Sequence, residues 1–165
     1  MMFKSWIPLP MNSPSPKFLG AINDSLPFPS LLRQGVTCFL GGNAGAFEEV
    51  NAWVNQAIQY TNDPTDDWQK PSDTLTLGTG DCEDYCLLKR ALLIERGFTD
   101  AELMMVVGFD LDVRQEHAVL LGQYDNDWWV MDNRTASVMR SNSFEDFHPT
   151  KGYKALDSYI FGVTK

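Results

Sequence analysis

The sequence predicts an α+β fold, in which helices precede an antiparallel sheet. Three observations support this fold class. Apolar residues recur at helical spacing between residues 47 and 60 and again between 81 and 97. After residue 100 the apolar pattern shifts towards a period of two, which is typical of strands. A cluster of Asp and Asn residues at 125–127 lies between two such stretches and predicts a hairpin turn.

The amino-terminal segment differs in composition from the rest of the chain. Residues 1–45 carry most of the prolines and only short apolar clusters, so they are predicted to form an irregular arm that ends in a loop at 41–45. The remaining residues, 46–165, are predicted to form a single domain. A chain of 165 residues with 44% hydrophobic content is long enough to bury one core of this kind.

Two helices are predicted on either side of a long connection. The first begins near Phe47 and ends near Tyr60. Residues 61–80 are rich in Asp, Pro, Thr and Gly and predict a loop, whose length is typical of functional loops. The second helix begins after Asp81, a good N-cap, and ends at Gly97.

The strands of the predicted sheet follow these helices. They are expected at residues 103–109, 117–124, 128–131 and 159–163. The sheet is expected to be antiparallel, with the second helix packed on it.

Composition excludes several classes of function. The net charge of -9 and a pI near 4.5 argue against a nucleic-acid partner, because phosphate backbones are bound by clustered Lys and Arg. No signal peptide or membrane span is visible, and three cysteines do not make a disulfide framework. The expected location is therefore the cytoplasm, or a virion if the protein is encoded by a phage.

Cys82 is the first candidate for chemistry. It lies in the first turn of the second predicted helix, where unpartnered N–H groups favour a thiolate and can stabilise an oxyanion. The acidic neighbours Asp81, Glu83 and Asp84 have the opposite effect, because their charge raises the pKa of the thiol. Activation of Cys82 is therefore expected to depend on what neutralises these acids.

A base and an orienting acid lie in the predicted strands. The chain has two histidines, and His117 heads an apolar strand, whereas His148 is expected in a surface loop. Asp132 ends the next strand, and a hairpin centred near residues 124 and 125 would place it opposite His117 on one face. The three residue types predict a Cys-His-Asp triad of Cys82, His117 and Asp132 for acyl transfer.

These motifs resemble the bacterial transglutaminase-like cysteine proteinases. The resemblance covers residues 47–135 and rests on GDCEDY at 80–85, a histidine that opens a strand, and VMDN at 130–133. Further similarity lies in VNAWVN at 50–55 and in Trp68 with its neighbours. The family includes a periplasmic calcium-dependent protease that cleaves biofilm adhesins.

The resemblance implies a papain-like core and a protease that acts on a protein or peptide. It assigns Cys82, His117 and Asp132 to the triad, and it implies a calcium site at Asp81 and Glu83. Two other aspartates, at 66 and 67, are additional candidate ligands. Trp68 is a candidate for the substrate cleft or the oxyanion site.

Other interpretations stay open at this point. The chain could be a non-catalytic structural or binding module, for example a virion assembly component with a protein partner, or a transglutaminase-type acyltransferase. Cys86 and Cys38 are interpreted as buried core residues. A zinc site at Cys82 and Cys86 is disfavoured, because neither a C-x-x-C motif nor a histidine-rich partner accompanies them.

Overall fold

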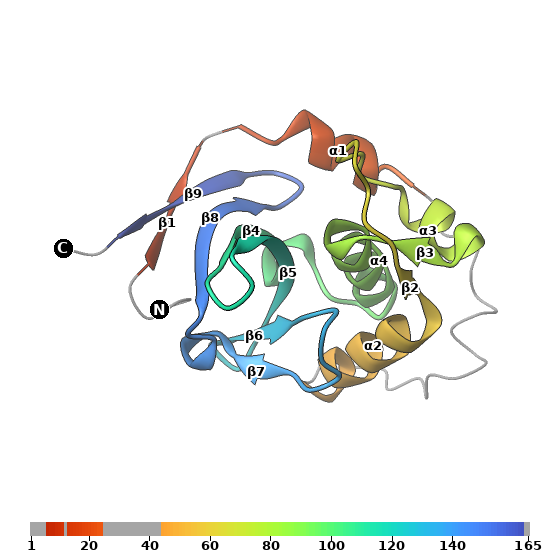
Figure 1. Cartoon of the computed structure of the whole chain (residues 1–165). Coiled ribbons are helices and arrows are strands. Elements are labelled where there is room, and N and C mark those ends of the chain that lie inside the picture. The colour runs from red at the N-terminus through yellow and green to blue at the C-terminus, as the bar shows by residue number, and fades with distance from the viewer. Residues whose placement is uncertain (1–5, 12, 25–43, 164–165) are drawn as a thin grey trace.

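The computed structural model describes residues 6–11, 13–24 and 44–163. Helices α2, α3 and α4 gather on one side of a seven-stranded sheet, so the predicted α+β fold is confirmed (Figure 1). The strand order is β1-β9-β8-β4-β5-β6-β7, and each neighbouring pair is antiparallel. Within the described ranges, no helix is long and apolar enough to cross a bilayer.

The elements have the following bounds. The main sheet contains β1 (Trp6–Pro10), β4 (Leu103–Asp110), β5 (Gln115–Tyr124), β6 (Asp127–Met131), β7 (Met139–Arg140), β8 (Phe147–Tyr153) and β9 (Ser158–Val163). The helices are α1 (Pro16–Ile22), α2 (Ala44–Ala57), α3 (Pro71–Leu77) and α4 (Cys82–Glu95), with 3-10 turns at Asp100–Glu102 and Ser141–Ser143. The short strands β2 (Gln59–Tyr60) and β3 (Thr79–Gly80) pair in parallel.

Helix α4 is the central helix of the fold, and its predicted bounds are confirmed. Asp81 is its N-cap, and Gly97 follows its end with a φ of 97°, a left-handed conformation that glycine adopts without a steric penalty. Most of the residues of α4 are buried, since α4 lies between the sheet and the other helices. The sequence motif that contains Cys82 is therefore anchored in the interior.

Helix α2 begins earlier than predicted. It spans Ala44–Ala57, so part of the expected loop at 41–45 is helical, and the chain leaves the helix before residue 60 to form β2. Phe47 of α2 packs against Gly122 of β5, where a Cβ atom would lie only 2.5 Å from the Phe47 ring. Gly122 thus allows the close approach of α2 to the sheet.

The sheet is apolar on both faces. One face packs under the helices through Leu103, Met105, Leu120 and Met131. The opposite face forms a second cluster, made by strand residues Met104, Val106, Val119, Leu121, Val130, Phe147 and Phe161. Burial on both sides explains why β4 and β5 read as almost continuous apolar runs.

Two predicted irregular segments contain regular structure. In the arm at 1–45, β1 pairs with β9, and α1 follows with a Ser15 cap and a fully buried Phe18. The remainder of the arm, 25–43, lies outside the described residues. The predicted loop at 61–80 contains α3, which starts with Pro71 at its first helical position and ends at Gly78, with φ 69°.

Strand β8 was also missed. His148, expected in a surface loop, is an exposed residue of β8, beside Pro149. The single Pro and the polar residues of this segment obscure its alternation, but its backbone pairs with both β4 and β9.

Candidate active site

The amino-terminus of α4 is closed by reciprocal hydrogen bonds. The Asp81 Oδ1 atom accepts a hydrogen bond from the Asp84 N–H at 3.3 Å, and Asp84 Oδ2 accepts one from the Asp81 N–H at 3.1 Å. Gly80 makes this arrangement possible, because a Cβ atom at residue 80 would lie 2.7 Å from the Asp84 Cβ. The Gly-Asp-Cys-Glu-Asp stretch therefore fixes Cys82 as the first residue of the helix.

Asp84 also attaches the preceding connection to α4. Its carboxyl group is completely buried and accepts hydrogen bonds from the backbone N–H of Gln69 at 2.8 Å and from Gln69 Nε2 at 2.9 Å. Burial raises the pKa of Asp84 to about 7, with a further contribution from the neighbouring Asp81 carboxylate. Asp84 thus has a structural role, since it holds the segment around Gln69 against the helix turn that contains Cys82.

The Cys82 side chain is buried, with 8% of its surface exposed. Its Sγ atom donates a hydrogen bond to Glu83 Oε2 at 3.0 Å. Burial raises the pKa of the thiol, and the charge of Glu83 raises it further, while a hydrogen bond from the Ala118 N–H opposes this effect. In this arrangement burial and the acidic neighbour outweigh the helix dipole, so the thiol form of Cys82 is favoured over the thiolate.

His117 and Asp132 form a buried pair. The His117 Nε2 and Asp132 Oδ1 atoms lie 3.0 Å apart, and both side chains are almost fully buried. Burial opposes ionisation of Asp132, but hydrogen bonds from His117 and Arg134 offset it and hold its pKa well below the usual range. An ionised Asp132 favours the tautomer with a proton on His117 Nε2.

The hairpin brings this pair together with a different register from the one predicted. Asp125 and Asn126 form a two-residue turn with positive φ, so Tyr124 pairs with Asp127 and Leu120 with Met131. Asp132 follows the last paired residue of β6 and therefore reaches His117 diagonally across the strands. A turn centred one residue later than expected accounts for the difference.

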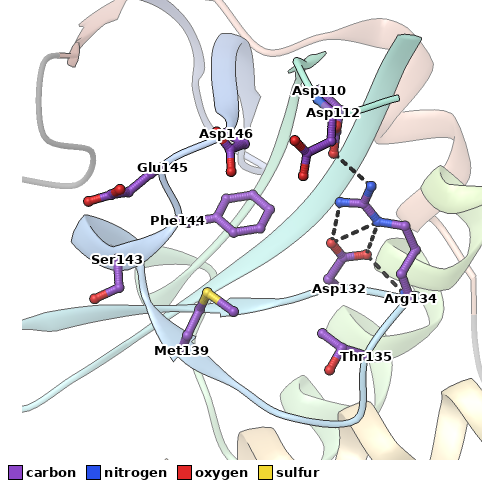
Figure 2. Close-up of a pocket in the computed structure, with 10 residues that line it drawn as sticks. All are labelled: Asp110, Asp112, Asp132, Arg134, Thr135, Met139, Ser143, Phe144, Glu145 and Asp146. Carbon is purple, nitrogen blue, oxygen red and sulfur yellow. Dashed lines mark hydrogen bonds and ion pairs between the residues drawn. The ribbon is translucent and has the colours of Figure 1, made fainter. Parts of the chain in front are cut away.

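Arg134 is a residue of this site that the sequence interpretation missed. Its guanidinium donates to Asp132 from Nε at 3.1 Å and from Nη2 at 2.7 Å, and Nη1 donates to Asp110 Oδ2 at 2.6 Å (Figure 2). Arg134 therefore connects Asp132 to the end of β4. The position of an arginine two residues after Asp132 was the available signal in the sequence. Spacing alone does not determine, however, whether the Arg134 side chain points towards Asp132 or away from it.

Asp132 and Arg134 both line a cavity of about 420 Å³. Figure 2 shows Phe144 and Met139 on one side of it and acidic side chains from the 110–112 and 145–146 segments around it. Neither Cys82 nor His117 lines this cavity. Asp132 therefore contacts His117 with one oxygen and lies at the edge of an open space as well.

The candidate metal ligands Asp81 and Glu83 lie next to each other. Burial raises the pKa of Glu83, and contact with the Cys82 thiol lowers it, while the charge of Asp81 and a hydrogen bond between the two carboxyl groups raise it. Among the described residues, no group of three or more His, Cys, Asp or Glu side chains has the arrangement of a metal site. Asp81 and Glu83 thus form a pair of oxygen donors, and the described part of the chain adds no third side chain of these types to them.

The additional acidic candidates have other partners. Asp66 accepts a hydrogen bond from Lys17 Nζ at 3.0 Å, and Asp67 accepts one from the Thr65 hydroxyl at 2.7 Å. Trp68 packs edge-on against Tyr153 with ring centroids 5.2 Å apart. Its Nε1 is buried and has no hydrogen-bond partner in the described part of the chain.

Two further buried side chains of α4 lie beyond the nucleophile. Cys86 is a free, buried thiol one turn after Cys82, as predicted, whereas Cys38 lies outside the described residues. Lys89 is fully buried one turn later, and its Nζ lies 5.6 Å from the centroid of the Tyr85 ring. Among the described residues, the Lys89 ammonium has no hydrogen-bond partner, and burial lowers its pKa to about 8.

Solved structures share this fold. Legionella pneumophila LapG matches with a TM-score of 0.63 and 24% identity, over 70% of this chain and 67% of that protein. A calcium-bound form of LapG matches with a TM-score of 0.64 at the same identity and coverage, and an EGTA-treated form with 0.63 and 65% of that protein. No curated protein sequence matches at a significant level.

A protein-family model matches more of the sequence than the motifs alone. The model describes the bacterial transglutaminase-like cysteine proteinases (BTLCP) and matches residues 41–148, which is more than half of the chain. The matched range includes Cys82 in α4, His117 in β5 and Asp132 directly after β6. The chain therefore belongs to the bacterial transglutaminase-like cysteine proteinase family and is a transglutaminase-like cysteine protease.

Proposed function

We propose that Cys82, His117 and Asp132 form the triad with which this protease cleaves a peptide bond in a protein substrate. The main support is the buried hydrogen bond between His117 and Asp132, located next to the nucleophile helix. The Cys82 sulfur accepts a hydrogen bond from the N–H of Ala118, the residue after His117, so nucleophile and base lie on adjacent elements.

The chemistry follows from the orientation of His117. Its Nε2 faces Asp132, which leaves Nδ1 as the basic nitrogen. The Cys82 S–H proton moves to Nδ1, and the sulfur attacks the substrate carbonyl carbon. The C–N bond then breaks, and the amine leaves with the proton from Nδ1, which gives a thioester. Water attacks the thioester, His117 accepts its proton and returns it to the sulfur, and the acid is released.

Glu83 has to release the thiol before this proton transfer. The Cys82 S–H points to Glu83 Oε2, and both burial and the Glu83 charge keep the proton on the sulfur. A cation that engages Glu83 would remove both the acceptor and its charge. Such a cation would therefore favour transfer of the proton to His117 instead.

Calcium fits the two carboxylates by its donor chemistry. Asp81 and Glu83 hold their carboxyl groups in contact, an arrangement that costs energy unless a proton or a cation neutralises it. Calcium binds about six to eight oxygen atoms, which carboxylates, backbone carbonyls and water can supply. When bound, it would neutralise these carboxylates, and a calcium-bound LapG of the same fold is consistent with this assignment.

A titration with calcium tests the assignment. Isothermal calorimetry is expected to detect calcium binding to the wild type and at least about tenfold weaker binding to Glu83→Gln, because one charged ligand is lost. Asp81 is less suitable for substitution, since its side chain caps α4. Glu95→Gln, an exposed change at the other end of α4, is the matched control and should bind like the wild type. Identical isotherms for wild type and Glu83→Gln would exclude this site.

Thiol labelling tests the triad without a known substrate. In the presence of calcium at pH 6 to 7, iodoacetamide is expected to label Cys82 at least about tenfold faster in the wild type than in His117→Ala, because the imidazole accepts the thiol proton. Tandem mass spectrometry distinguishes Cys82 from Cys86. His148→Ala is the control, since this second histidine is exposed on β8. Equal, slow labelling in wild type and His117→Ala would contradict the triad.

Equal labelling would instead support the second candidate, a binding module that retains the fold. One observation favours that candidate: the Cys82 thiol donates its proton in a hydrogen bond to Glu83, an arrangement that keeps the sulfur protonated. Transamidation with an amine acceptor is the other acyl transfer open to the same three residues. Membership of a proteinase family favours hydrolysis over this reaction.

A further inference from the structure

Two asparagines of α2 contact the segment that carries Asp132. Asn51 Nδ2 donates to the Thr135 carbonyl at 2.7 Å and to the Ala136 carbonyl at 3.2 Å. Asn55 Nδ2 donates to the Asp132 carbonyl at 2.9 Å and to the Thr135 carbonyl at 2.9 Å. Since residues four apart lie on one face of a helix, both amides reach the same short segment.

This segment has left the sheet when it reaches the asparagines. The pairing of β6 with β5 ends at Met131, and its pairing with β7 involves only Trp129 and Val130. Asp132 and the residues up to 136 therefore lack the ladder bonds that fix a strand. The side-chain amides of α2 supply donors in their place, and Asn51 does so from a fully buried position.

We propose that Asn51 and Asn55 are positioning residues of the catalytic site, acting on His117 through Asp132. Asn55 fixes the main chain of Asp132, while the carboxylate of Asp132 receives His117 Nε2 and the Arg134 guanidinium. Displacement of the Asp132 backbone would move the oxygen that orients the imidazole. The inference rests on the proposed function of the triad.

The amide nitrogen of Asn55 donates both hydrogen bonds of this contact. An aspartate of the same shape would direct a carboxylate oxygen at the carbonyls of Asp132 and Thr135, which is repulsive, whereas alanine would leave both carbonyls without this donor. Asn55 is half-buried, so these substitutions are more easily tolerated than changes at Asn51. Asn55→Ala and Asn55→Asp are therefore the informative variants.

The first test is steady-state kinetics on one peptide that the wild type cleaves, chosen from a proteome-derived peptide library. Asn55→Ala is expected to lower kcat about 10- to 100-fold with little change in KM, because misplacement of a catalytic group by about 1 Å has effects of this size. Asn55→Asp should lose at least as much activity. Gln56→Ala, which removes an exposed amide from the next position of the helix, should retain full activity.

A double-mutant cycle separates positioning from general destabilisation. If Asn55 acts through Asp132, Asn55→Ala should have little further effect on kcat in an Asp132→Ala background. A full additional loss in that background would overturn the proposal, since Asn55 would then act independently of Asp132.

Proton NMR of histidine-labelled protein provides a readout that does not need activity. The N–H proton of His117 that faces Asp132 is expected to broaden or exchange faster in Asn55→Ala, while the signals of His148 stay unchanged. An unchanged His117 signal would overturn the proposal even if the wild type cleaves peptides. A wild type without cleavage activity but with the expected NMR change would contradict the proposed function alone.

Discussion

Cleavage of a peptide library is expected to fall by at least about 10³-fold when Cys82 is replaced with alanine, because the thioester can no longer form. The change removes only the sulfur atom, and the hydrogen bonds that cap α4 use Asp81 and Asp84 instead. The variant should therefore keep its fold. Mass spectrometry of newly formed amino termini, together with a thermal melt, measures both properties.

Cys86→Ala is the matched control for this prediction. It removes the same atom from the same helix one turn later, at a thiol that is also buried. Its cleavage rate should stay close to that of the wild type, although loss of buried volume can lower its melting temperature slightly. Cleavage that persists in Cys82→Ala would assign the nucleophile to another residue.

Replacement of Lys89 with methionine is expected to stabilise the protein at neutral pH. The Lys89 ammonium is fully buried and, in the described part of the chain, has no hydrogen-bond partner, which lowers its pKa from 10.5 to about 8. This difference corresponds to about 3 kcal/mol. Methionine has a similar length without the charge, so the variant avoids this desolvation cost.

The stabilisation should depend on pH in a defined direction. Between about pH 8 and 10.5 the unfolded chain still binds the lysine proton whereas the folded protein does not, so wild-type stability rises with pH across this window. Below pH 8 both states are protonated and the cost is constant. The advantage of Lys89→Met is therefore largest below pH 8 and disappears towards pH 10.5.

Urea unfolding of wild type and Lys89→Met at several pH values measures this difference, and other titrating groups cancel in the comparison. Lys151→Met, at an exposed position of β8, should show no such pH-dependent difference. A difference for Lys89→Met that does not vary from pH 7 to 10 would show that the lysine is not the source of the effect.

The sequence predicted the elements whose signals are local. Helix α4 was predicted well because Asp81 and Gly97 mark its ends, and the turn at Asp125 and Asn126 marks the hairpin. Helix α3 was missed because a helix of seven residues shows too little periodicity, although Pro71 and Gly78 flank it. Strand β1 was missed because its partner β9 lies at the other end of the chain.

The candidate site was predictable in its residue types and not in its contacts. The approach of His117 to Asp132 follows from the hairpin, but a shift of one residue in the turn changed which residues lie opposite. The Glu83 contact with the thiol and the direction of Arg134 depend on side-chain conformations, which spacing does not determine. The location predicted from the sequence, cytoplasmic or virion-associated, finds no support in the structure or in the matched proteins.

The pairing of β1 with β9 has a consequence for self-association. The backbone N–H of Met11 donates to the Ser158 carbonyl at 2.8 Å. In an antiparallel pair every second residue directs its N–H and C=O groups towards the partner strand, so Leu9 also faces β9 in this way. Pro8 and Pro10 therefore face outward, where a further strand would need N–H donors that proline lacks. At the opposite edge, β7 has only two residues. Within the described residues, neither edge of the sheet therefore offers a continuous row of donors and acceptors, an arrangement that disfavours edge-to-edge aggregation.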